Sequence, residues 1–215
     1  MIYLYAITDT RPTALDSAGI DGAKVESSEG AGLHAVWSLH SDDAELTPTP
    51  SALWAHEAVV DELLAAGAVL PLRFGTTLRD DEAVRDLLHR QRRRFRTLLD
   101  RVRGHVELAV RVALPESHAN APATGAAYLR TLAASERERT AAAQRVLAPL
   151  DRLATASSHR RDAAAVLRAS YLVRPEEVER FAAALGRLQD AYPELTVSCT
   201  GPWAPYSFVA EDTRS

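Results

Sequence analysis

The sequence predicts an α+β protein of two domains, residues 1–103 and 104–215. Short apolar runs typical of strands alternate with longer segments that repeat apolar residues every three or four positions. Gly104 separates the end of a long helical pattern from a strongly alternating strand pattern, which marks the domain boundary. The chain has 215 residues, enough for one large or two small domains without disulfide support.

The first domain is expected to hold three strands and two helices. The strand patterns cover residues 2–7, 33–40 and 68–77, and the helical patterns cover residues 50–66 and 81–103. The first strand has apolar side chains on both faces, which predicts a central place in its sheet. Thr49 can cap the first helix, and Pro50 suits its first position, where no amide hydrogen is needed. The residues expected to be buried by this helix are Leu53, His56 or Trp54, Val60, Leu63 and Leu64.

The segment Ala68–Thr77 is a short apolar strand between two helices, and the domain is organised around it. Pro71 interrupts the apolar run and Gly75 ends it, as expected for a buried or edge strand. Arg73 lies between Leu72 and Phe74; a salt bridge inside the sheet is the favoured interpretation, and recognition of an acidic partner group is the alternative. We therefore predict structural roles for Pro71, Arg73, Phe74 and Gly75.

The second domain reads as strand, helix, strand, helix and strand. These patterns cover residues 105–114, 125–156, 164–174, 175–190 and 195–200. The order predicts a modified ferredoxin-like (split β-α-β) sandwich with a long helical segment and an antiparallel sheet. Trp203, Tyr206 and Phe208 follow in a proline-rich tail. The tail is expected to cover the core of the second domain; a docking surface is the alternative.

Composition narrows the possible locations and partners. The single cysteine, Cys199, excludes an internal disulfide, and no apolar run approaches the roughly 20 residues that span a bilayer. The net charge of −4 gives no general attraction to nucleic acid or to anionic membranes. The sequence therefore predicts a soluble, cytoplasmic protein that binds neither.

Two short motifs suggest enzyme chemistry, but neither has the spacing or context that the chemistry requires. His56-Glu57 begins like a zinc-protease helix, in which the second histidine lies four residues after the first; that position is Val60, so zinc lacks a ligand. Gly30-Ala31-Gly32 is similar to a nucleotide-binding turn, but it precedes a strand instead of opening a helix. We predict no catalytic residue, metal or cofactor, and a hydrolase using His56 and Glu57 is kept only as an alternative.

The segment from Arg90 to Arg96 carries the strongest positive charge in the chain. Asp86 and Asp100 lie about a turn away, as on an ordinary solvated helix face, so a charged face or protein interface is favoured over a phosphate-binding site. We predict partner-binding roles for Arg92, Arg93 and Arg96, together with the tail residues Trp203, Tyr206 and Phe208. A nucleic-acid-binding regulator that uses Arg90–Arg96 is the alternative function.

Taken together, several motifs resemble the gas vesicle protein F/L family. The residues that carry the resemblance are Tyr3-Leu4-Tyr5-Ala6-Ile7, Val69 to Thr76, Phe95-x-x-x-Leu99, Val106-Glu107-Leu108 with Val110, Gly125-x-x-Tyr128-Leu129, Tyr171-Leu172-Val173, and Gly201-Pro202-Trp203-x-Pro205-Tyr206-Ser207-Phe208. The match spans nearly the whole chain in order. Ala204 departs from it, since the family more often has a second proline there, and the strand near Lys24 is poorly defined.

The resemblance implies a two-domain α+β fold and a non-enzymatic accessory role in building gas vesicles. It implies as partners the hydrophobic shell protein and other gas vesicle accessory proteins, bound during nucleation or growth of the shell. Location at the gas vesicle, after a cytoplasmic stage, follows from the same resemblance. The groove between the domains or the aromatic tail is expected to supply apolar contacts, and the arginine-rich helix is expected to meet acidic surfaces.

Overall fold

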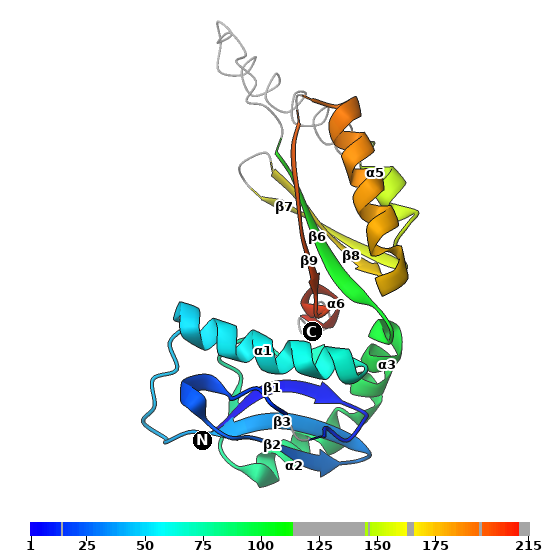
Figure 1. The fold of residues 1–215 in the computed structure, drawn as a ribbon. Coiled ribbons are helices and arrows are strands. Elements are labelled where there is room, and N and C mark those ends of the chain that lie inside the picture. Colours follow the sequence, from blue (N-terminus) through cyan, green and yellow to red (C-terminus); the bar gives the residue numbers. More distant parts are fainter. Residues whose placement is uncertain (14, 114–144, 146, 163–165, 194, 211–215) are drawn as a thin grey trace, which may run out of the picture. The chain divides into compact units, whose positions relative to one another are not determined.

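The computed structural model describes residues 1–13, 15–113, 145, 147–162, 166–193 and 195–210 (Figure 1). Its contacts divide the chain into two compact units. The first is Met1–Val106 together with the C-terminal segment that starts at Trp203, and the second is Glu107–Pro202. The second unit is thus inserted into the first. This division differs from the predicted domains because the tail, assigned by the sequence to the second domain, belongs to the first unit.

The first unit is built on a five-stranded antiparallel sheet with a fully buried central strand. The strands are β1 (Ile2–Thr8), β2 (Val25–Gly30), β3 (Leu33–Leu39), β4 (Val69–Pro71) and β5 (Thr77–Leu78). Their order is β2-β3-β1-β4, and β5 also pairs with β1. All seven residues of β1 are buried, which confirms the prediction of a central strand. The short 3-10 helix η1 (Ile20–Gly22) precedes β2.

The Gly30-Ala31-Gly32 segment is the turn of a β-hairpin. Gly30 pairs with Leu33 across β2 and β3, and Ala31 and Gly32 between them have φ angles of 55° and 71°. Two successive positive φ angles are typical of the two-residue turns that match the strand twist. The segment leads into a strand, so the expected turn is confirmed and no nucleotide-binding helix follows it.

Helices cover both faces of this sheet. They are α1 (Pro50–Ala66) on one face, α2 (Asp81–Arg90) on the other, and α3 (Arg92–Val102), which follows α2 (Figure 1). The predicted helix over residues 81–103 is in fact two helices, because Gln91 leaves helical geometry with φ −99° and ψ 9°. The apolar positions expected along it, from Val84 to Val102, are nevertheless buried on both sides of the break.

The second unit contains a four-stranded sheet. Its elements are β6 (Val106–Ala113), β7 (Ala156–Asp162), β8 (Val166–Val173), η2 (Pro175–Glu177), α5 (Val178–Ala191) and β9 (Thr196–Trp203), with residues 145 and 147–151 also helical. The strand order is β7-β8-β6-β9. The sequence missed β7, because Ser-Ser-His-Arg-Arg has no apolar alternation. This strand is held instead by its antiparallel pairing with β8, from Ala156 opposite Leu172 to Asp162 opposite Val166.

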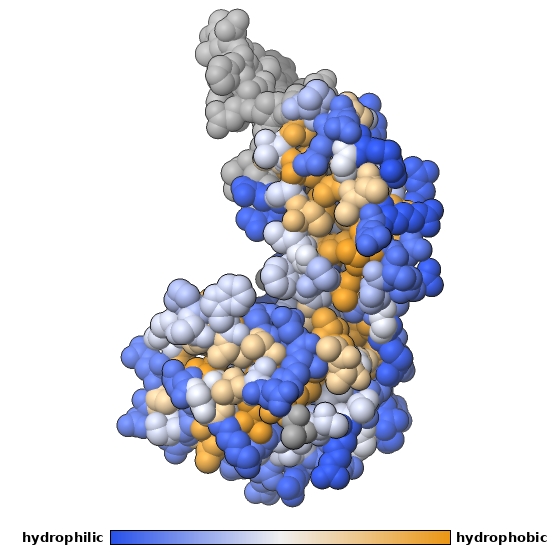
Figure 2. Space-filling model, in the orientation of Figure 1, coloured by the Kyte–Doolittle hydropathy of each residue, from blue (hydrophilic) through white to orange (hydrophobic). Residues whose placement is uncertain are grey.

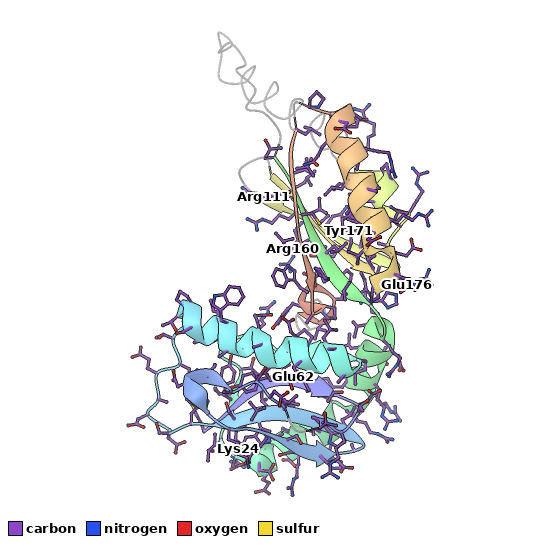
Figure 3. The ribbon with its side chains drawn as sticks, viewed as in Figure 1. Lys24, Glu62, Arg111, Arg160, Tyr171 and Glu176 are labelled. Carbon is purple, nitrogen blue, oxygen red and sulfur yellow. The ribbon has the colours of Figure 1, made fainter. Side chains whose placement is uncertain are left out.

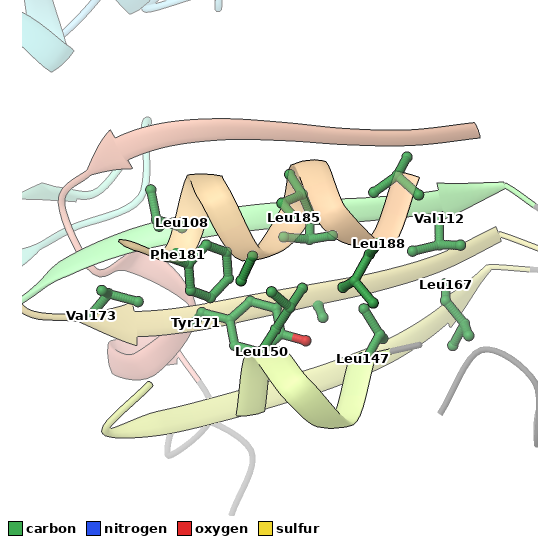
Figure 4. Packing of buried hydrophobic residues seen from close by; sticks show 14 residues of the cluster. Leu108, Val112, Leu147, Leu150, Leu167, Tyr171, Val173, Phe181, Leu185 and Leu188 are labelled. Atoms are coloured by element: carbon green, nitrogen blue, oxygen red, sulfur yellow. The ribbon is translucent and has the colours of Figure 1, made fainter. Parts of the chain in front are cut away.

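The core of the second unit lies between this sheet and two helical segments (Figure 4). Leu147 and Leu150 from the first helical segment and Phe181 from α5 are at most 1% exposed. The rings of Tyr171 and Phe181 lie 5.0 Å apart between their centroids. Phe181, Leu185 and Leu188 are buried as the spacing of α5 predicts. Of the helix predicted over residues 125–156, residues 145 and 147–151 are helical, whereas residues 125–144, with the motif at Gly125, lie outside the described residues.

Candidate functional site

A buried chain of hydrogen bonds in the first unit links three elements that are far apart in the sequence. β1 supplies Tyr3, α1 supplies His56 and Glu57, and the short helix α6 (Tyr206–Ala210) supplies Tyr206. The Tyr3 hydroxyl lies 2.8 Å from His56 Nδ1, and His56 Nε2 lies 3.1 Å from the Tyr206 hydroxyl. Tyr206 in turn donates to Glu57 Oε1 at 2.9 Å. The chain fastens the C-terminal segment to α1.

These bonds can all form around a neutral His56 ring. Because Tyr206 donates its proton to Glu57, its oxygen is free to accept from His56 Nε2–H, and in that tautomer Nδ1 accepts from Tyr3. The Tyr3 oxygen also accepts from the Gly75 amide at 3.4 Å. Every member of the chain is therefore satisfied when the imidazole is neutral.

Burial shifts the pKa values of this group in the same sense, against charge. His56 is 1% exposed, and loss of hydration lowers its pKa to about 4. Burial raises the pKa of Glu57, although its hydrogen bond from Tyr206 acts in the opposite direction. Burial is also the largest cause of the raised pKa of Tyr206. Burial therefore disfavours the charged form of each of these three groups.

A second polar chain lies beside the first. The Tyr5 hydroxyl accepts from the Ile20 amide at 2.9 Å and lies 2.7 Å from Ser38 Oγ, which lies 2.8 Å from His40 Nε2. The Tyr5 and His56 rings are 5.5 Å apart, so the two chains share one core. A Cβ at Gly19 would collide with the Tyr5 hydroxyl, which explains why glycine fits there.

This arrangement does not support the hydrolase alternative. Both ring nitrogens of His56 are occupied by tyrosine hydroxyls, so metal ligation requires breaking the chain. Within the described part of the chain, no three His, Cys, Asp or Glu side chains are grouped as metal ligands. The motif is explained by packing, and the tyrosines that hold it are 53 and 150 residues away.

The segment Pro71–Gly75 contributes to the same core at two of its four predicted positions, Pro71 and Phe74. Pro71 pairs with Ala6 in β4, and the Phe74 ring lies 5.6 Å from Tyr3 and 6.0 Å from His56. Gly75 has φ 85°, a left-handed conformation that favours glycine. Arg73 differs from expectation: it is exposed and forms no ion pair with a described residue, because the chain turns out of the sheet after β4.

The arginines of α3 form a cationic surface. Arg92, Arg93 and Arg96 are exposed and lie within one helix face. Nearby carboxylates have other partners, since Asp86 pairs with Arg90 and Asp100 pairs with Arg103. Across the described ranges, none of these three arginines forms an ion pair. We call Arg92, Arg93 and Arg96 the arginine face.

The aromatic tail packs on the first unit, so the prediction that it covers the core of the second domain was wrong. Ala204 is fully buried among residues of β1, β3 and α1, and Phe208 is 1% exposed. The Arg101 guanidinium lies 5.6 Å from the centroid of the Phe208 ring. Trp203 is 40% exposed and is the tail aromatic that reaches the surface.

The sequence also misassigned the surface of α1. Leu53 was expected in the core but is 42% exposed; of the two alternatives His56 and Trp54, His56 is buried and Trp54 is 72% exposed. The tyrosine hydroxyls make this polar side chain acceptable in the core, and their presence could not be deduced from the helix alone. None of the described helices is long and apolar enough to cross a membrane.

Sequence comparisons place the chain among gas vesicle proteins. The family profile described as gas vesicle synthesis protein GvpL/GvpF matches residues 1–210. Gas vesicle protein F of a Streptomyces species is 37% identical, covering 81% of this chain and 84% of that protein. Gas vesicle protein F2 of Halobacterium salinarum is 29% identical, covering 97% of this chain and 91% of that protein.

A comparison with solved structures agrees at the level of the fold. The crystal structure of GvpF from Anabaena matches with a TM-score of 0.82 at 22% identity, covering 97% of this chain and 95% of that one. The structure of GvpF from Microcystis aeruginosa matches with a TM-score of 0.81 at 20% identity. With its profile match over nearly the whole length and its relatives above 30% identity, this chain belongs to the GvpL/GvpF family of gas vesicle synthesis proteins.

Proposed function

We propose that this protein is a non-enzymatic accessory factor that binds the hydrophobic shell protein and other gas vesicle proteins during nucleation or growth of the vesicle. The observation that carries the proposal is the family match over residues 1–210, which supports a role in gas vesicle formation. A subunit that polymerises through apolar surface needs a partner that covers this surface beforehand. The protein acts in the cytoplasm before assembly and then at the vesicle.

The arginine face is the proposed contact for acidic surfaces of these partners. Other arginines of the first unit form ion pairs with neighbouring carboxylates. Arg85, for example, lies 2.7 Å from Asp81. No carboxylate of the described residues pairs with the arginine face, so an incoming carboxylate does not have to displace one of them. Trp203 is the proposed apolar contact of the tail, whereas Phe208 is buried and Tyr206 is held by His56 and Glu57.

The first test is co-expression with the shell protein from the same vesicle-forming organism, followed by purification through a tag on this chain. We expect a complex with the wild type and at least about tenfold weaker binding when Arg92, Arg93 and Arg96 are all changed to Glu. The control changes Arg174, Arg180 and Arg187 to Glu, three exposed positions of the second unit with the same total charge change. Lack of any complex, with normal vesicles in cells that lack the protein, contradicts the proposal.

The same arginine face is the observation that favours the alternative, a nucleic-acid-binding regulator. Such binding releases counterions, so its affinity falls steeply and linearly with salt concentration on a logarithmic scale. The net charge of −4 opposes it. Tight, salt-sensitive binding of duplex DNA or of RNA that is lost in the triple Glu variant supports the regulator over the assembly factor.

For the fold, we propose that residues 107–202 form a modified ferredoxin-like domain and that the two units are separate domains. The order β7-β8-β6-β9 supports this, because the first strand of the unit lies between its third and fourth strands, as in the split β-α-β arrangement. The helical residues 145 and 147–151 precede β7, and α5 precedes β9, at the two places where this arrangement has helices.

A further inference from the structure

The outward side of α1 is unusual for a surface helix. Leu53, Trp54, Ala58, Asp61 and Ala65 are exposed, and we call these residues the α1 outer face. Trp54, Ala58, Asp61 and Ala65 follow one another at steps of four, three and four residues, so they form one stripe along the helix. Trp54 is 72% exposed and Leu53, at its flank, is 42% exposed. Figure 2 shows apolar side chains among hydrophilic ones on the visible face of this unit.

The side-chain sizes along this stripe suit the packing of another helix. A large side chain at Trp54 stands at one end, and the alanines at 58 and 65 leave shallow positions beyond it. Small residues allow a second helix to approach closely, while a large aromatic fits into its grooves. Single exposed apolar residues are ordinary, but on α1 two large ones, Leu53 and Trp54, are neighbours at the start of a stripe of small residues.

The charges of α1 are all negative. Its sequence has the acids Glu57, Asp61 and Glu62 and no lysine or arginine. Glu62 (Figure 3) accepts hydrogen bonds from the amides of Asp16 and Ser17 at 2.8 and 3.0 Å, and Glu57 accepts from Tyr206. Asp61 forms no hydrogen bond or ion pair within the described ranges. Partial burial raises its pKa, as expected for a carboxylate set among apolar side chains without a cation.

We propose that the α1 outer face binds an amphipathic helix of the shell protein, with the apolar stripe of that helix on Trp54 and Leu53 and a Lys or Arg side chain paired with Asp61. This rests on the proposed function, whose partner surface it specifies. Charge complementarity selects the occupant, because an acid-only apolar face pairs best with a basic amphipathic helix. A second copy of this chain fits less well: its arginine face offers the positive charge but no apolar side chain to cover Trp54.

The test uses the full chain and the co-expressed shell protein as the probe, with binding measured for Trp54→Ser and Asp61→Asn. Each is expected to weaken binding about tenfold, the effect of removing a central anchor or a paired charge. Asp61→Glu is expected to retain most of the binding. The matched controls are Leu39→Ser and Asp43→Asn, an exposed leucine and an exposed aspartate away from α1, which are expected to bind as the wild type does.

The outcomes separate the two proposals. Wild-type binding that Trp54→Ser and Asp61→Asn leave unchanged overturns this inference and leaves the proposed function standing. Failure of the wild type to bind the shell protein overturns the shell-binding part of the proposed function and this inference with it. If the purified chain dimerises alone and Trp54→Ser abolishes the dimer, the occupant is a second copy and the inference is wrong. Equal urea midpoints of the variants and the wild type show that a loss of binding does not come from unfolding.

Discussion

His56 shows how one side chain can be fixed by partners that the local sequence does not contain. On its own helix it belongs to a short motif that suggests metal chemistry. In the structure its two nitrogens lie within hydrogen-bond distance of tyrosines from the first strand and the last helix, and burial favours the neutral ring. The sequence indicates a helix and a buried position nearby, but neither tyrosine is close enough in the chain to be identified as a partner.

We expect the stability of the protein to depend on pH through His56. The pKa of His56 in the folded chain is about 4, below the ordinary value of 6.5, so the unfolded chain binds more protons between these values. The stability contributed by the neutral ring is present above pH 6.5 and is lost as the pH falls toward 4. From pH 7 to pH 5 the loss is about 2 kcal/mol.

The measurement is urea unfolding at pH 7 and pH 5 for the wild type and His56→Gln. The variant cannot titrate at this position, so its loss of unfolding free energy over the same range is expected to be smaller by about 2 kcal/mol. Burial raises the pKa of Glu57, which opposes the His56 effect at lower pH, and this is why the comparison stops at pH 5. Identical pH dependence in the two proteins contradicts the assignment.

At the scale of elements, the sequence predicts best where periodicity and burial agree. The central strand, the hairpin turn and the apolar positions of α5 all follow from local patterns. The predictions fail where tertiary contacts decide. β7 is polar and is a strand because it pairs with β8, Gln91 interrupts a continuous helical pattern, and Leu53 of α1 is exposed.

The tail is the element whose position the sequence most clearly missed, and its contribution can be measured. Phe208 is 1% exposed, so Phe208→Ala removes a buried ring and is expected to reduce the free energy of unfolding by about 3–5 kcal/mol. Trp54→Ala is the control, since a side chain that is 72% exposed is expected to matter by about 0.5 kcal/mol or less. A mild effect of Phe208→Ala in urea unfolding contradicts the packing of the tail on the first unit.

For the whole molecule, the main finding is that residues from both sides of the inserted unit build the first unit. The sequence locates the point near Gly104 where the chain passes from the first unit to the second, because a helix ends and an alternating strand begins there. It does not locate the point where the chain returns to the first unit, since β9 and the tail read as one continuous strand and aromatic segment. Composition and periodicity contain no signal for which core receives the ring of Phe208.

This organisation predicts the behaviour of fragments. We expect residues 1–106 joined by a short Gly-Ser linker to residues 203–210 to unfold cooperatively, and residues 1–106 alone to be less stable by about 3–5 kcal/mol. The start of β6 and the end of β9 lie at the same end of their sheet, so a short linker suffices (Figure 1). Near-ultraviolet circular dichroism and urea unfolding measure the difference. Equal stability of the two fragments contradicts a structural role for the tail.

The inserted arrangement also imposes an order on synthesis by the ribosome. The second unit is one continuous stretch and can fold as soon as residues up to Pro202 have emerged, whereas the first must wait for Phe208 although its sheet is translated earlier. During that interval the inner side of α1 lacks Tyr206, and Glu57 and His56 have an unmet bond. Nascent chains stalled just short of the tail are therefore the form most exposed to chaperones and proteases.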